Sequence, residues 1–152
     1  MAEPAPVSWW AIVDGRERIR PDATYVMVAN HLSLLDILVL FRLFRHFKWV
    51  SKIENFKVPV IGWNMRLNGY IPLVRGDKES AATMMDQCRR TLRRGTSIMM
   101  FPEGTRSRTG ALQEFKTGAA RIALDAGAPI LPVAVLGTRD ALIKHDWRFG
   151  RS

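Results

Sequence analysis

His31 and Asp36 are the residues of this sequence whose types and spacing best suit acid–base chemistry. They lie five positions apart in the segment NHLSLLD, which spans residues 30–36. Inside one helix this spacing would place them on different faces, but we expect the helix to begin after Ser33, with Asp36 in its first turn. A carboxylate there can point back to the preceding loop, accept the imidazole N–H and leave the other ring nitrogen as a base. The segment therefore predicts a His–Asp dyad that activates a hydroxyl group supplied by a substrate.

A structural interpretation of the same residues stays open. His31 could be an ordinary loop histidine and Asp36 the acid of a capping box, with Ser33 as the helix cap rather than a nucleophile. No Gly-x-Ser-x-Gly elbow occurs in the sequence. From spacing alone the structural interpretation is the more common one, because paired ionisable groups are often structural.

Two further segments place arginine where it could bind an anion. Arg75 follows an apolar run at residues 70–74, and Arg106 follows the turn-forming stretch PEGT at 102–105. Gly104 would let the backbone approach a ligand closely, and backbone N–H groups beside Arg106 would suit an anion such as phosphate. Taken alone, the PEGT stretch could be a simple tight turn and the arginines solvated loop charges.

Strand and helix patterns alternate along the chain. Short apolar runs predict strands at 25–29, 48–51, 70–74, 97–101 and 130–136, and helical spacing with caps predicts helices at 33–47, 59–68, 79–94 and 117–126. This order is typical of an α/β fold with a mainly parallel sheet flanked by helices. The carboxyl ends of such strands meet at one rim, where α/β proteins bind ligands. We therefore expect His31, Arg75 and Arg106 to face one site.

Composition restricts the partners more than the chemistry. The 152 residues suit one domain over 1–152. A net charge of +9 and a pI near 10.6 indicate an anionic partner: a phosphate-bearing metabolite, an anionic membrane surface or nucleic acid. The single cysteine, Cys88, excludes an intrachain disulfide framework.

Several classes of site and anchor have no pattern in the sequence. No apolar stretch reaches the length of about 18 residues that spans a bilayer, and the N-terminus lacks a signal-peptide pattern. His46 and His145 show no metal-ligand spacing with His31, and no Walker loop or dinucleotide fingerprint occurs. We expect no metal and no tightly bound cofactor. Trp9 and Trp10 could lie at a lipid interface or pack as a satellite cluster.

Four blocks, in order, resemble the 1-acylglycerol-3-phosphate acyltransferase family of phospholipid synthesis. NHLSLLD at 30–36 resembles the catalytic His-x4-Asp block, GYIPLVR at 69–75 the second block, FPEGTRS at 101–107 the third and LPVA at 131–134 the fourth. Each block is short, but all four with family-like spacing make a specific pattern. The resemblance extends over about residues 13–138. It implies a glycerolipid acyltransferase-like core at 13–138, apparently shortened at both ends, with an N-terminal extension at 1–12.

The resemblance also implies roles for residues. His31, oriented by Asp36, would deprotonate the free hydroxyl of a lysophosphatidic acid, whose oxygen attacks the thioester of acyl-CoA or acyl carrier protein to give phosphatidic acid. The residues implied in substrate binding are Arg75, Glu103, Gly104, Thr105 and Arg106, with Lys52 and Lys116 as looser candidates for anion contacts. Arg75 and Arg106 would neutralise the acceptor phosphate, and Glu103 would either order its loop or bind the acceptor. The acyl donor is then a substrate, and no cofactor is expected.

Family members often carry N-terminal hydrophobic helices and continue beyond the fourth block. From the implied substrate class and the positive net charge, we expect peripheral association with the cytoplasmic side of an anionic membrane. The alternatives are a related acyltransferase acting on glycerol-3-phosphate or another lysolipid, or a truncated non-catalytic module that binds lipid phosphate. Nucleic acid is not an expected partner, because no recognised binding motif accompanies the positive charge.

Overall fold

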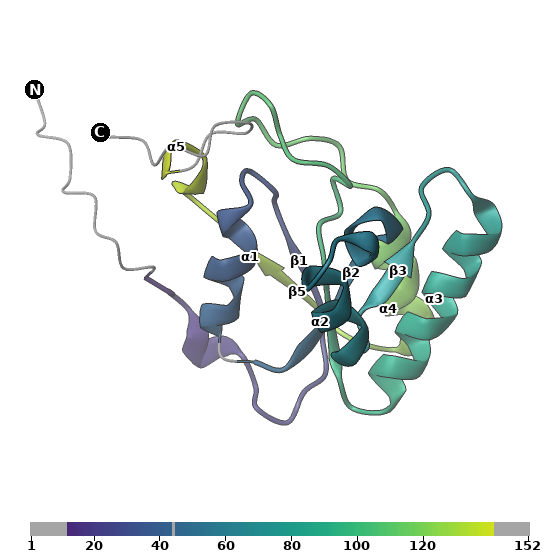
Figure 1. Ribbon diagram of the computed structural model, residues 1–152. Coiled ribbons are helices and arrows are strands. Elements are labelled where there is room, and N and C mark those ends of the chain that lie inside the picture. The colour runs from purple at the N-terminus through teal and green to yellow at the C-terminus, as the bar shows by residue number, and fades with distance from the viewer. Residues whose placement is uncertain (1–11, 44, 142–152) are drawn as a thin grey trace, which may run out of the picture.

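The computed structural model describes residues 12–43 and 45–141 (Figure 1). The expected N-terminal extension at 1–12 lies almost wholly outside the described residues. Trp9, Trp10 and His145 also lie outside them.

Within the described residues, one five-stranded sheet forms the centre of the fold. Its strands are β1 (Val26–Ala29), β2 (Phe47–Lys52), β3 (Ile71–Leu73), β4 (Ser97–Met100) and β5 (Ile130–Val133), in the order β3-β2-β4-β1-β5. Every neighbouring pair is parallel; for example, Met27 of β1 lies in register with Met99 of β4 and Leu131 of β5. The predicted mainly parallel sheet is confirmed.

Helices cover both faces of this sheet. They are α1 (Leu35–Leu40), α2 (Ile61–Leu67), α3 (Lys78–Arg93) and α4 (Gly118–Ala126), with the 3-10 turns η1 (Arg16–Arg18), η2 (Phe41–Leu43) and η3 (Ile53–Lys57) and the short α5 (Thr138–Ala141). The crossovers from β1 to β2 and from β2 to β3 run one way across the sheet, and those from β3 to β4 and from β4 to β5 run back. Right-handed crossovers therefore place α1 and α2 on one face and α3 and α4 on the other (Figure 1).

Alternation along the strands divides the core into two clusters. Val26, Ile98 and Met100 pack with Cys88 of α3 and Ile122 of α4 on one face. On the other face, the cluster contains Met27, Ala29, Leu40, Phe47, Trp49 and Met99. The central strands β1 and β4 are largely apolar on both sides because both of their faces are covered, whereas β5 at the edge is partly exposed.

The boundaries differ from the predicted ones where tertiary contacts decide them. The helix predicted over 33–47 ends as α1 at Leu40, so that prediction is wrong at its C-terminal end. Phe47 begins β2 instead, in register with Ser97, and its ring stacks on Phe41 at 5.7 Å. The turn η3 was not predicted. Strand β5 ends at Val133 rather than at residue 136.

None of the helices in the described part of the chain has the length and apolar character needed to cross a membrane.

Candidate active site

The loop after β1 brings His31 and Asp36 into direct contact. His31 Nδ1 lies 2.8 Å from Asp36 Oδ2, which is the hydrogen bond expected in a His–Asp dyad. A carboxylate can only accept, so in the neutral imidazole Nδ1 carries the proton and Nε2 has the free lone pair. Nε2 has no hydrogen-bond partner among the described residues. The side chain of His31 is 14% exposed, so part of it is open to solvent.

Asp36 is fully buried and is held in its ionised form by donors. Its Oδ2 accepts the backbone N–H groups of Leu32 (2.6 Å) and Ser33 (2.9 Å), and its Oδ1 accepts the Thr138 hydroxyl at 2.5 Å. Burial by itself would raise the pKa of Asp36. The hydrogen bonds from His31, Ser33, Thr138 and Leu32 together outweigh it, so the pKa lies below its usual value of 3.8.

The backbone and ring of His31 are fixed by the loop after β4. The His31 N–H donates to Glu103 Oε1 at 2.7 Å, and the His31 carbonyl accepts the Ser107 N–H at 2.8 Å. The imidazole stacks on the Phe101 ring, with centroids 3.9 Å apart and planes 8° from parallel. The imidazole is therefore fixed from the β4 loop as well as from Asp36.

Glu103 is 5% exposed, and both of its carboxylate oxygens accept backbone N–H groups. Oε1 accepts from His31, and Oε2 accepts the N–H of Gln113 at 2.9 Å. This geometry corresponds to the loop-ordering role that the sequence left open beside acceptor binding. Through these two hydrogen bonds, Glu103 joins the His31 loop to Gln113, in the segment between β4 and α4.

A basic cavity opens where β3 meets α3. It has a volume of about 270 Å³ and is lined by Arg75, Lys78 and Lys116 together with Leu73, Val74, Gly76, Asp77 and Ala81. Gly104, at φ 72°, lies under Lys116: a Cβ at Gly104 would stand 3.0 Å from Lys116 Nζ. A side chain there would crowd the ammonium group, and Gly104 directly follows Glu103. Lys116, which lines this cavity, thus lies beside the residue that follows Glu103.

The other predicted binding residues lie apart from this cavity. Lys52 is exposed at the end of β2, Thr105 is exposed, and Arg106 is half-buried; none of the three lines the cavity. Thr105 contributes its carbonyl, which accepts from the Gln113 side chain at 3.1 Å. The cavity therefore brings Arg75 together with Lys116, and it does not include Lys52, Thr105 or Arg106.

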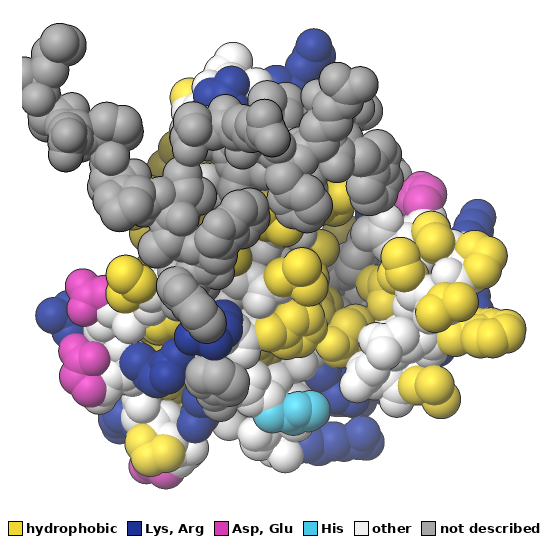
Figure 2. Space-filling view, turned by 60° about the vertical axis from the view of Figure 1, so that its left-hand side comes forward, with side chains coloured by type: hydrophobic (Ala, Val, Ile, Leu, Met, Phe, Trp, Pro, Cys, Tyr) yellow, Lys and Arg dark blue, Asp and Glu magenta, His cyan; other side chains and the backbone are white. Residues whose placement is uncertain are grey.

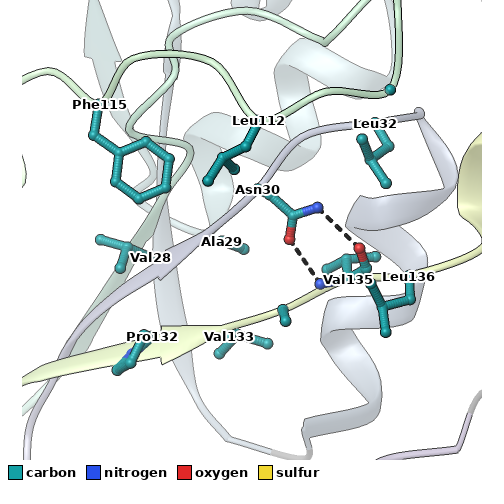
Figure 3. A pocket seen from close by; sticks show the side chains of 12 residues that line it. Val28, Ala29, Asn30, Leu32, Leu112, Phe115, Pro132, Val133, Val135 and Leu136 are labelled. Carbon is teal, nitrogen blue, oxygen red and sulfur yellow. Dashed lines mark hydrogen bonds between the residues drawn. The ribbon is translucent and has the colours of Figure 1, made fainter.

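An apolar cavity of about 480 Å³ lies on the other side of the His31 loop, beside β5 (Figure 3). Its wall includes Val28, Leu112, Phe115, Val133 and Leu136, and the two neighbours of His31, Asn30 and Leu32. The Asn30 amide bonds both main-chain groups of Val135, donating to its carbonyl at 2.8 Å and accepting its N–H at 2.7 Å. Asn30 thereby ties the end of β1 to the chain leaving β5.

Three contributors to this site had no predicted role. Thr138 comes from α5, far along the chain, and no local signal marks it as a partner of Asp36. Phe101 belongs to the third block, but its stacking on His31 depends on the register of β4 beside β1. Asn30 directly precedes His31, and this position is its only signal.

The described residues contain no group of three or more His, Cys, Asp or Glu side chains that could hold a metal ion. The expectation that no cofactor is required stays a prediction.

Comparison with known proteins indicates the same family that the four sequence blocks resemble. The family model described as Acyltransferase matches residues 11–136. The 1-acyl-sn-glycerol-3-phosphate acyltransferase of Chlamydomonas reinhardtii is 46% identical over 82% of this chain and 38% of its own length. The chloroplastic 1-acyl-sn-glycerol-3-phosphate acyltransferase LPAT1 of Arabidopsis thaliana is 40% identical over 83% of this chain and 36% of its own length.

A solved structure has the same fold. The crystal structure of the 1-acyl-sn-glycerophosphate (LPA) acyltransferase PlsC from Thermotoga maritima matches with a TM-score of 0.78 at 32% identity, over 91% of this chain and 55% of that one. The chain thus spans about a third to a half of the length of these relatives. This chain belongs to the Acyltransferase family. Its glycerolipid acyltransferase-like fold is that of PlsC.

Proposed function

We propose that this chain is the catalytic core of a 1-acyl-sn-glycerol-3-phosphate acyltransferase, which acylates lysophosphatidic acid to phosphatidic acid. The observation that carries the proposal is the His31–Asp36 pair at 2.8 Å, with Nε2 of His31 unpartnered among the described residues. A base without a neighbouring nucleophilic side chain suits a reaction in which the substrate supplies the hydroxyl.

In this reaction, Nε2 of His31 takes the proton of the acceptor hydroxyl while its oxygen attacks the thioester carbonyl. The tetrahedral intermediate collapses, the C–S bond breaks, and the protonated imidazole returns the proton to the departing thiolate. Asp36 stabilises the imidazolium that exists between these two steps, because its carboxylate is ionised and lies against Nδ1. No proton is gained or lost overall.

Arg75 and Lys116 are proposed to bind the acceptor phosphate. Both line the 270 Å³ cavity, and a phosphate there would receive charge-assisted hydrogen bonds from a guanidinium and an ammonium group. Holding the phosphate fixes the hydroxyl near His31, which is catalysis by orientation. Arg106, Thr105 and Lys52, which lie outside the cavity, are proposed to contact the remaining polar groups of the acceptor or the donor.

The 480 Å³ cavity supports an acyl-chain site. Its lining is mostly apolar, and Asn30 and Leu32 place it against the catalytic loop. The acyl donor is proposed to be acyl-CoA or acyl carrier protein. From the substrate class, we propose that the chain acts at the cytoplasmic surface of an anionic membrane as a peripheral protein.

The test is product formation by the purified chain from lysophosphatidic acid with palmitoyl-CoA or with palmitoyl-acyl carrier protein. Glycerol-3-phosphate and lysophosphatidylcholine serve as competing acceptors. Phosphatidic acid formed from one of the two donors, at a rate well above that with either other acceptor, is the expected result. Preference for glycerol-3-phosphate would contradict the proposed acceptor.

Removing the proposed phosphate contacts gives a more local prediction. Arg75→Gln and Lys116→Gln should each raise the KM for lysophosphatidic acid about tenfold or more, because charge-assisted hydrogen bonds contribute about 1.5–3 kcal/mol each. The KM for the acyl donor should change much less. Arg93→Gln, an exposed arginine at the end of α3, is the matched control. Equal effects at all three positions would contradict the assignment.

A further inference from the structure

Helix α2 and the turn before it expose an unusual amount of apolar surface. Val58 is 43% exposed, Val60 72%, Ile61 56%, Trp63 69% and Leu67 88%. We call these five side chains the α2 surface. Figure 2, which turns the α1 face toward the viewer, shows hydrophobic side chains gathered on this side of the molecule. A patch of this kind on a protein surface marks an interaction site.

The inner side of α2 is already committed to the fold. Gly62 and Met65 are buried, and Gly62 lies so close to η3 that a Cβ there would stand 2.0 Å from the Phe56 carbonyl oxygen. The helix therefore cannot roll to bury the α2 surface. Its exposed side chains are fixed outward.

The turn before α2, which carries part of the α2 surface, has a strained backbone. Val60 has φ 63° and ψ −54°, and Ile61 donates its N–H to the Pro59 carbonyl at 2.7 Å. These values describe the classic γ-turn, a rare conformation that is especially unfavourable for a β-branched residue. Val60 is nonetheless mostly exposed, so burial of its side chain does not offset the cost. Strain of this kind is found at functional sites.

The charge around the α2 surface identifies its partner. Residues 52–68 carry Lys52, Lys57 and Arg66 against a single acid, Glu54. All three basic side chains are exposed, and none forms an ion pair within the described part of the chain. An exposed tryptophan and aliphatic side chains flanked by basic residues suit the interface of an anionic bilayer, where the apolar groups enter the acyl boundary and the cations meet lipid phosphates.

We propose that the α2 surface is a docking site for an anionic lipid bilayer, with Ile61 and Trp63 inserted at the headgroup level and Lys57 and Arg66 on lipid phosphates. The inference rests on the proposed function in one respect: a lysolipid acceptor resides in a bilayer. The segment 53–67 follows Lys52, which pairs in register with Leu73 at the wall of the basic cavity. Docking there would hold the cavity close to the lipid phosphates.

The test reads the environment of single sites. Trp63→Cys and Leu124→Cys are each labelled with an environment-sensitive fluorophore; Leu124, on α4 and 82% exposed, is the matched control on the opposite face. Cys88 can stay, because it is buried and burial raises the pKa of its thiol to about 12. Adding phosphatidylglycerol vesicles should shift the emission of the label at 63 to the blue and leave the label at 124 unchanged. A shift at neither site, or at 124 alone, would overturn the proposal.

A second measurement separates docking from catalysis. The double variant Ile61→Ser/Trp63→Ser should lose tenfold or more in binding to the same vesicles, and Leu124→Ser should lose almost nothing. Turnover on detergent-dispersed substrates should be the same for both variants. Undiminished vesicle binding by the double variant would overturn the docking site. So would concentration-dependent dimerisation that the double variant abolishes, since a second copy would then cover the surface. Vesicle binding that depends on these residues, with no turnover on any substrate, would leave docking in place and refute the proposed function.

Discussion

Asp36 combines complete burial with a full set of donors, and its ionisation is therefore coupled to folding. Four hydrogen bonds reach its two oxygens, from Leu32, Ser33, His31 and Thr138. They hold the pKa of Asp36 below 3.8 although burial opposes this. The folded state thus binds a proton less readily than the unfolded state does. This difference stabilises the fold above about pH 4 and is lost as the pH falls through the folded pKa.

Acid unfolding should therefore depend on the Asp36 contacts. Thr138→Val removes the donor to Asp36 Oδ1 and leaves the other three hydrogen bonds to Asp36. The pKa of Asp36 in the folded state should therefore move up toward 3.8. Urea unfolding at pH 7, 4 and 3 should show that wild type loses more of its free energy of unfolding below pH 4 than the variant does. Ser80→Ala, which removes a hydroxyl bonded to the Val74 N–H, controls for the loss of a hydrogen bond elsewhere. Identical acid profiles for wild type and Thr138→Val would contradict this account.

Glu103 offers a similar test of positioning against substrate binding. Both carboxylate oxygens accept backbone N–H groups. In Glu103→Gln, the side-chain NH₂ group would face one of these two backbone N–H groups, and neither can accept a hydrogen bond. A buried donor left without an acceptor costs about 1–3 kcal/mol. The variant should therefore lose both thermal stability and kcat, because the His31 loop is displaced. A rise in the acceptor KM with unchanged stability would instead indicate that Glu103 binds the acceptor.

The packing of α2 on η3 depends on the absence of one side chain. A Cβ at Gly62 would meet the Phe56 carbonyl oxygen at 2.0 Å, and neither partner can move without shifting backbone. Gly62→Ala should destabilise the fold by about 1–3 kcal/mol. Gly118→Ala, in α4, meets nothing within 4 Å and should be neutral or stabilising by up to about 1 kcal/mol. Chemical denaturation of both variants measures the difference, and equal effects would contradict the close contact between α2 and η3.

The strands were predictable and the short helices were less so. Val26–Ala29 and Ser97–Met100 were predictable as buried strands. Each is an almost continuous apolar run between turn residues, which is the pattern of a strand covered on both faces of a sheet. The run from Leu34 to Phe47 is largely apolar, and only its tertiary partners decide where helix ends and strand begins. The γ-turn at Val60 has no sequence signal, because a β-branched residue is the least expected at positive φ.

The residues of the site were likewise predictable only in part. His31, Asp36 and the two arginine-bearing loops follow strand ends, and a parallel sheet brings strand ends together; their catalytic and binding roles remain predictions. Thr138 lies 102 residues from Asp36, and its contact depends on how the chain returns after β5. Lys116 and Arg75 line the same cavity although they lie far apart in the sequence, and the Lys116 ammonium group lies close to Gly104. Contacts between distant segments require the assembled fold, which spacing alone does not give.

The charge of the whole molecule should affect donor capture. With a net charge of +9, the chain attracts polyanionic donors over distances that salt screens. The kcat/KM for palmitoyl-CoA should fall about threefold or more between 20 and 200 mM salt, with kcat nearly constant. The uncharged N-acetylcysteamine thioester of palmitate is the control, and its kcat/KM should be almost independent of salt. Equal salt dependence for both donors would contradict electrostatic capture.

The most direct measurement is thiol release from the acyl donor, with and without lysophosphatidic acid, for wild type, His31→Ala and His46→Ala. His46 is an exposed histidine between η2 and β2 and provides the matched control. Acceptor-dependent release should fall about a thousandfold in His31→Ala, because general-base catalysis contributes about 10²–10⁴-fold, and should be unchanged in His46→Ala. Equal, acceptor-dependent release by all three folded proteins would contradict the assignment of His31 as the base.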